Sequence, residues 1–146
     1  GVDGVMKFVI PGNPVAQGRP RFSRAAGFVR VYDPKKSVDF KSTIALFATQ
    51  AGLKPMIGPL RVSIDLFFKR PKARCRKRDL DGPIPCDKRP DIDNCCKIFL
   101  DALNGIAYKD DGQVYSIKVI KWYHAKNEAP RSVVEIEEIE GREQNG

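Results

Sequence analysis

The sequence contains little of what builds a zinc site or a membrane span. It has one histidine, His124, and its four cysteines show no C-x-x-C spacing. Zinc sites are usually built from such Cys and His pairs, so this composition argues against one. No apolar run approaches the roughly 18 residues that a membrane helix needs, and no signal peptide is recognisable. We therefore expect a cytoplasmic protein with reduced thiols and no membrane association.

What the sequence does contain is positive charge. It carries 26 Lys and Arg against 18 Asp and Glu, a formal net charge of +8 in 146 residues. A chain of this length forms about one domain and can bury a core without disulfides. The charge favours nucleic acid or another anionic partner, although a basic protein without such a partner has the same composition.

Hydrophobic patterning predicts a single mixed α/β (α+β) domain over residues 1–146. The clearest strand is 60–68, where apolar and polar residues alternate with a period of two. Two helices are interleaved with the strands, so we expect one mixed sheet of about four to five strands with two main helices. Residues 140–146 are expected to form a tail. Strands are expected at 6–10, 28–32, 60–68, 114–123 and 132–139, and helices at 34–50 and 93–104.

Two segments concentrate the basic residues. Residues 12–24, GNPVAQGRPRFSR, are rich in Gly, Pro and Arg and predict a loop. Residues 69–90 have no apolar periodicity and predict a long exposed loop, either functional or a solvated linker. Phe22 or Phe28 could wedge against exposed DNA bases, but packing in the core is the simpler role for both. Phosphate contacts, which weaken steeply with salt, are expected from Arg19, Arg21, Arg24, Lys72, Arg74, Arg76, Lys77, Arg78 and Arg89.

Three aspartates stand out from this basic background. Asp91 and Asp93 lie in RPDIDN, just before an apolar helical run, and Asp111 lies in KDDGQV after it. Pro90 is incompatible with a helix interior, so Asp91 lies in extended chain and the helix begins near Asp93. Both carboxylates then lie beside the free N–H groups of the helix start. Carboxylates suit Mg²⁺, so we expect all three acids to converge on folding into one metal site.

The helix that follows allows two interpretations. Most of its positions are apolar, as in a buried helix, yet Asp93, Lys97 and Asp101 form one polar stripe. An ion-pair ladder on a solvated face explains this stripe. It does not explain the acids on either side, Asp91 and Asp111. A metal site accounts for the whole set.

The run RPDIDNCCKIFLDALNGIAYKDDGQV, residues 89–114, resembles the RusA family of Holliday junction resolvases, in its phage and prophage branch. The early segment GNPVAQGRPRF and the basic loop before RPDIDN are similar to the same branch. The resemblance implies a RusA-like fold and a homodimeric, Mg²⁺-dependent endonuclease that cuts four-way DNA junctions symmetrically, with Mn²⁺ able to replace Mg²⁺. On matching positions, Asp91, Asp93 and Asp111 would bind the metal, and Lys97 would match the family's functional lysine.

Phosphodiester hydrolysis needs an activated water and neutralisation of charge at phosphorus, which Mg²⁺ supplies without a nucleotide cofactor. Lys97 would stabilise the developing negative charge or orient the water. Asn94, Asp101 and Asp110 are expected to support the ligands. Asp110 also belongs to a DDG sequence that is common in ordinary turns, so on its own it indicates little.

Other functions share some of these residues. A nuclease selective for flaps or replication forks would use the same acids. A branched-DNA-binding protein that has lost catalysis would keep the basic segments, although the intact acids argue against it. A Mg²⁺-dependent nucleotide phosphatase would not need the long basic loop. Cleavage of a mobile four-way junction beside duplex and flap controls separates these alternatives.

Overall fold

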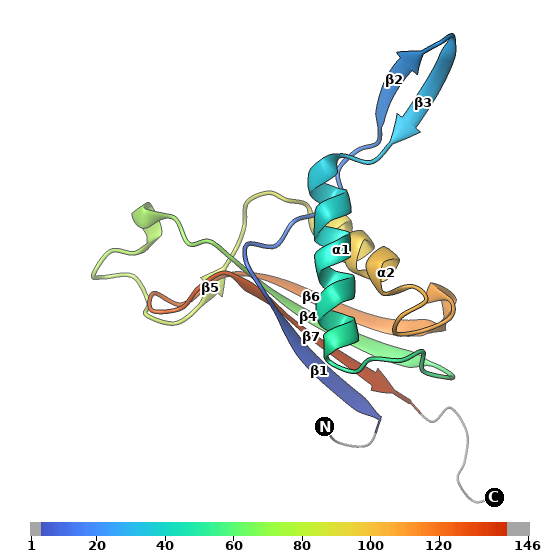
Figure 1. Cartoon of the computed structure of the whole chain (residues 1–146). Helices are drawn as coiled ribbons and strands as arrows, with labels where there is room; N and C mark the ends of the chain where they lie inside the picture. The colour runs from blue at the N-terminus through green and yellow to red at the C-terminus, as the bar shows by residue number, and fades with distance from the viewer. Residues whose placement is uncertain (1–3, 140–146) are drawn as a thin grey trace, which may run out of the picture.

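The computed structural model describes residues 4–139, and it shows two helices packed on one face of a mixed sheet (Figure 1). The mixed α+β domain expected from the sequence is confirmed. The tail expected at 140–146 lies outside the described residues. Among residues 4–139, no helix is both long and apolar enough to cross a lipid bilayer.

The main sheet has five strands in the order β1-β7-β4-β6-β5. Strands β4 and β6 are parallel, and β7 runs antiparallel to both of its neighbours, β1 and β4. The parallel pair requires a crossover, and helix α2 lies within it. The strands are β1 (Val5–Pro11), β4 (Leu60–Phe68), β5 (Ile84–Pro85), β6 (Val114–Tyr123) and β7 (Arg131–Glu138).

The core lies between this sheet and the helices α1 (Lys35–Gln50) and α2 (Ile92–Leu103). Alternate side chains of β4 are buried against the helices, as the period-two pattern predicts. The helices meet through Phe40 and Phe99, whose rings pack edge to face with centroids 5.7 Å apart. This packing fixes α2, and with it the aspartates at its start.

Strand β6 forms an open edge of the sheet for most of its length. Its outer neighbour β5 pairs only with Trp122 and Tyr123. Over 114–120, no strand within residues 4–139 pairs with that side of β6. Tyr115 is 56% exposed and Ile117 36%. An unpaired edge of this kind is a template for another strand.

A hairpin of β2 (Arg21–Ala25) and β3 (Phe28–Tyr32) forms a separate two-stranded sheet that projects from the body of the protein (Figure 1). The loop expected as far as residue 24 is therefore wrong from residue 21 onward, because a turn with Gly27 at φ +81° lets the chain pair with itself. Phe22 is 70% exposed and Phe28 75%, so the core role expected for both is wrong.

The basic loop at 69–90 is more structured than the sequence suggests. It contains a 3₁₀ turn at Lys72–Arg74 and the short strand β5. Arg70, close to its start, is only 4% exposed. The prediction of a wholly exposed loop is therefore wrong, because hydrogen bonds hold its main chain and Ile84 and Cys86 pack in the hydrophobic core.

Candidate functional site

Asp91 and Asp93 lie at the start of α2, as expected. Asp91 is the N-cap residue in extended conformation (φ −66°, ψ 141°), and Asp93 lies in the first turn. The Asp91 side chain makes no capping hydrogen bond. Both residues are exposed, and neither joins the ion pairs found within residues 4–139. Their oxygens are therefore available to a ligand beside the positive end of the helix.

An open hollow of about 720 Å³ lies beside these acids. Asp91, Asp93 and Lys121 line it, and we call it the acid hollow. Asp87 and Arg89, from the end of the basic loop, line it as well. The hollow thus borders on both α2 and the edge strand β6.

Lys121 is a site residue that the sequence analysis missed. Its ammonium group donates to the main-chain carbonyl of Pro90 at 2.6 Å and also to that of Lys88. These bonds hold the chain immediately before Asp91 and place a positive charge in the acid hollow. The available signal was a lysine inside the apolar run VIKWY, residues 119–123, because a charge in such a strand needs polar partners.

The cysteines near the acid hollow are poor ligands. Burial raises the pKa of the Cys95 thiol to about 11, against the opposing effect of Lys121. Burial also raises the pKa of Cys96. Because metals bind the thiolate, both residues are protonated and weak ligands at neutral pH. Cys86, which also lines the hollow, is buried, so the exposed ligands there are the carboxylate oxygens.

The three aspartates do not converge within one chain. Asp111 begins the 3₁₀ turn that precedes β6, beyond the C-terminal end of α2. Asp91 and Asp93 lie at the other end of this 12-residue helix, which is about 18 Å long. Within residues 4–139, no group of three acidic, His or Cys side chains is placed to hold a metal ion. The expected three-acid pocket of a single chain is therefore wrong, because α2 separates its members.

Asp110 shapes the turn that presents Asp111. Its carboxylate accepts a hydrogen bond from the Gly112 N–H at 3.2 Å, and its own N–H donates to Gln113 Oε1. Gln113 in turn donates to the carbonyl of Met56 at 3.0 Å. This capping box fixes the turn against the chain that leads into β4.

Lys97 lines a second hollow, of about 350 Å³, together with Asn94, Asp101 and Arg19. The ion-pair ladder from Asp93 to Asp101, the alternative interpretation of this stripe, does not form through Lys97, which joins none of the ion pairs of the described chain. Asp101 instead lies 3.9 Å from Lys41 Nζ. The Lys97 ammonium is thus available to an anion in this hollow.

The expected DNA-binding residues fall into two groups. Arg74 lies over the ring of Tyr123 at 5.7 Å, and Arg76 binds the carboxylate of Asp79 through two contacts of 3.1 Å. The charges of these two arginines are engaged within the protein. The others are exposed and join none of the ion pairs seen between residues 4 and 139: Arg19, Arg21, Arg24, Lys72, Lys77, Arg78 and Arg89.

Comparison with known proteins identifies the family. The family Endodeoxyribonuclease RusA matches residues 11–137, which include the hairpin, the basic loop and all three aspartates. The chain is also 39% identical over 140 residues to the "Uncharacterized protein YqaN" of Bacillus subtilis (strain 168), covering 92% of this chain and 96% of that protein. The protein belongs to the RusA family of endodeoxyribonucleases, which act on Holliday junctions.

Proposed function

We propose that this protein is a Mg²⁺-dependent, homodimeric endonuclease that resolves four-way DNA junctions by paired symmetric cuts, in DNA recombination and repair. One observation carries the proposal: two exposed carboxylates, without ion-pair partners among residues 4–139, flank the start of α2 and share a hollow with Lys121. In a basic chain of the RusA family, this is the place for a metal facing a phosphate.

Asp91 and Asp93 suit Mg²⁺, which is usually held by one or two carboxylates together with waters and phosphate oxygens. When bound, the ion activates water and offsets charge on the phosphate; Mn²⁺ is expected to substitute. The free N–H groups at the start of α2 favour a phosphate in the same place. Lys121 holds the segment that carries Asp91, and Lys97 stabilises the charge that develops on the phosphate oxygens.

A second copy of the chain would bring Asp111 to the other two acids. The open edges of two β6 strands can pair antiparallel about a two-fold axis. Pairing centred between Ile117 and Lys118 sets Tyr115 opposite Ile120 of the second copy, within the stretch of β6 that β5 leaves unpaired. Asp111, just before Val114 in the chain, then approaches the acid hollow of that copy, which Lys121 lines.

The dimer also accounts for paired cutting. Two acid hollows related by a two-fold axis match the two-fold symmetry of a four-way junction. Each hollow faces an equivalent strand, so the two cuts are symmetric. A nuclease selective for flaps or forks keeps the same acids and is the alternative. A non-catalytic branched-DNA-binding protein is disfavoured by the unpaired carboxylates.

A substrate panel tests the proposal. With Mg²⁺, a mobile four-way junction should be cut at symmetry-related positions on two strands, and the products should be ligatable nicked duplexes. Addition of EDTA should abolish the cuts, and duplex and flap substrates should remain intact. Equal cutting of flaps would favour the alternative nuclease. Binding without cutting, with either Mg²⁺ or Mn²⁺, would favour the non-catalytic protein.

The arm, which we define as residues 19–32, is proposed to contact DNA bases at the branch point. It carries four arginines and no acidic residue. Its exposed Phe22 and Phe28 can stack on bases that the junction leaves partly unstacked, an interaction worth about 1–3 kcal/mol per base. The arm is anchored next to the site, since the Gln17 N–H donates to the Asn94 carbonyl at 3.0 Å.

Replacing either phenylalanine of the arm by alanine should weaken junction binding by roughly 5- to 100-fold and change duplex binding little. Fluorescence anisotropy in EDTA measures both affinities. Ile57→Ala is the matched control, because Ile57 is an 82% exposed apolar residue outside the arm. Equal loss of duplex and junction affinity would contradict a role at the branch point.

A further inference from the structure

Arg70 is a buried cation that binds only main-chain carbonyls. It lies directly after β4 and Lys69, and its side chain is among the few charged groups in the interior. Within residues 4–139 it joins no ion pair. A buried guanidinium is costly unless its donors are satisfied. Its acceptors are the carbonyls of Arg74 at 2.7 Å, Leu80 at 2.7 Å, Gly82 at 2.9 Å and His124 at 3.4 Å.

These bonds fold the basic loop around one side chain. Three of the four carbonyls belong to residues 71–83, which we call the platform. One comes from near its beginning and two from near its end, so Arg70 joins parts of the platform that no helix or sheet connects. The platform leads through β5 to the acid hollow, and the Cys86 N–H donates to the Lys121 carbonyl at 3.0 Å.

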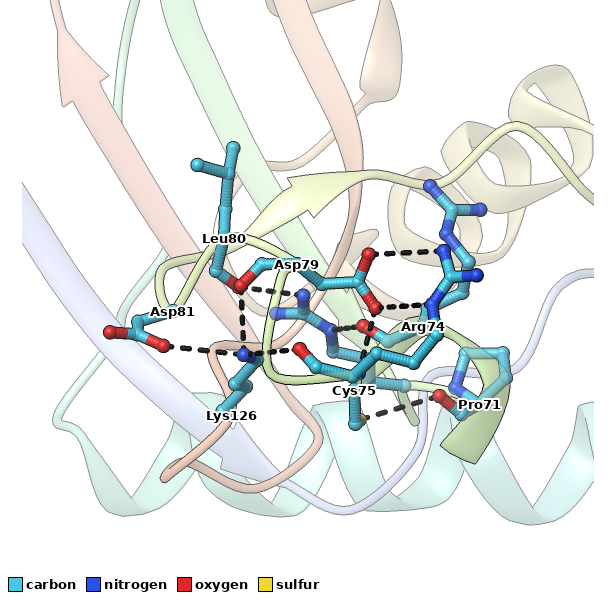
Figure 2. A network of polar contacts seen from close by, with 9 residues as sticks. Pro71, Arg74, Cys75, Asp79, Leu80, Asp81 and Lys126 are labelled. Atoms are coloured by element: carbon cyan, nitrogen blue, oxygen red, sulfur yellow. Dashed lines mark hydrogen bonds and ion pairs between the residues drawn. The ribbon is translucent and has the colours of Figure 1, made fainter.

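Lys126 also holds the platform (Figure 2). Its ammonium group donates to the carbonyls of Arg76 at 2.7 Å and Asp79 at 2.8 Å. It also lies 3.3 Å from the carboxylate of Asp81. The Lys126 N–H completes the attachment by donating to the Asp81 carbonyl at 2.9 Å. All the donors of the ammonium group are directed to the platform rather than to solvent.

Arg76 and Asp79 form an ion pair with each other at the tip of the platform. The Arg76 N–H donates to the Asp79 carboxylate at 2.7 Å, and the guanidinium binds the same carboxylate at 3.1 Å. Hydrogen bonds from Arg76 lower the pKa of Asp79 to about 2. The carboxylate therefore stays charged, and the pair stays formed, at any pH at which the protein would bind DNA.

We propose that the platform is a preformed binding surface for the DNA phosphate backbone, with separate holding and contacting cations. Arg70, Arg76 and Lys126 are positioning residues that hold its fold. The contacting residues are Lys72, Lys77 and Arg78, which are exposed and join no ion pair of the described chain. Because the surface is folded before DNA arrives, binding avoids the cost of ordering a long loop. That the polyanion is DNA rests on the proposed function.

Two variants distinguish the residues that hold the fold of the platform from those that contact DNA phosphates. A double Lys77→Ala, Arg78→Ala variant should lower the slope of log affinity against log salt by roughly two, since each lost phosphate contact removes about 0.9. Its amide hydrogen exchange over residues 74–83 should match wild type. Lys126→Met should instead accelerate this exchange and weaken junction binding roughly 3- to 10-fold, with the salt slope unchanged. All binding is measured in EDTA, with Lys54→Met as an exposed control outside the platform.

Each outcome decides one part of the proposal. A salt slope that falls by one in Lys126→Met would make Lys126 a phosphate contact and overturn its positioning role. An unchanged slope in the double variant, with cleavage intact, would overturn the platform as the contact surface. Wild-type protein that binds junctions but does not cut them would overturn the proposed function, whereas the expected slopes and exchange rates would still support the platform.

Discussion

Replacing Asp91 or Asp93 by asparagine should slow junction cleavage by about a thousandfold or more and leave junction binding near the wild-type level. Asparagine keeps the size and shape of the side chain but removes the charge that holds a divalent cation. Under the proposed function, affinity for DNA comes from the arm and the platform, which neither substitution touches. Single-turnover cleavage with Mg²⁺ and anisotropy in EDTA measure the two effects separately.

Asp87→Asn is the matched control for this experiment. Asp87 is also exposed and lines the acid hollow, but it does not lie at the start of α2. Its removal should change cleavage only about two- to threefold. Equal losses in all three variants would mean that the summed charge of the hollow matters rather than two particular ligands. Cleavage by Asp91→Asn at the wild-type rate would show that Asp91 is not a metal ligand.

The sequence predicts those features that depend on local chemistry. Alternation alone locates β4 at Leu60–Phe68, and the structure confirms both ends. Pro90 excludes a helix before Asp91, so the extended N-cap and the helix behind it follow from a few neighbouring residues. The hairpin was missed in part because its Ala26–Gly27 turn carries no strong signal of the Asn-Gly kind.

The features that the sequence does not predict depend on contacts between distant residues. Lys121 binds the Pro90 carbonyl, 31 positions away, and Arg70 binds that of His124, 54 positions away. Composition marks both as basic residues among many others. Only the fold shows that both side chains bind main-chain carbonyls, so counting cations overestimates the DNA-contacting surface.

Asp111 is the clearest example of this limit. Its short separation from α2 suggests that it lies near the acids at the helix start, but the chain leaves α2 at the opposite end. A short separation in sequence does not show at which end of the helix a residue lies. In the proposed dimer the open edge of β6 would supply what one chain lacks, because an antiparallel partner exchanges the two ends of the strand.

Co-expression of two inactive variants should therefore restore cutting. Asp91→Asn and Asp111→Asn chains, each with its own affinity tag, give mixed dimers after two purification steps. If each site combines Asp91 of one copy with Asp111 of the other, one hollow carries both substitutions and the second carries none. The mixed dimer should then introduce single nicks, at about half the wild-type rate, because one of two equivalent sites is intact.

A site contained within one chain predicts the opposite, since each hollow of the mixed dimer would then carry one substitution and remain inactive. The control is a mixed dimer of Asp91→Asn and Asp93→Asn chains. Both residues line the same hollow of one copy, so this dimer has no intact site under either arrangement. Nicking by the first mixture and not by the second would assign Asp111 to the partner's hollow. If neither mixture nicks, Asp111 either acts in the site of its own chain or is not part of the site.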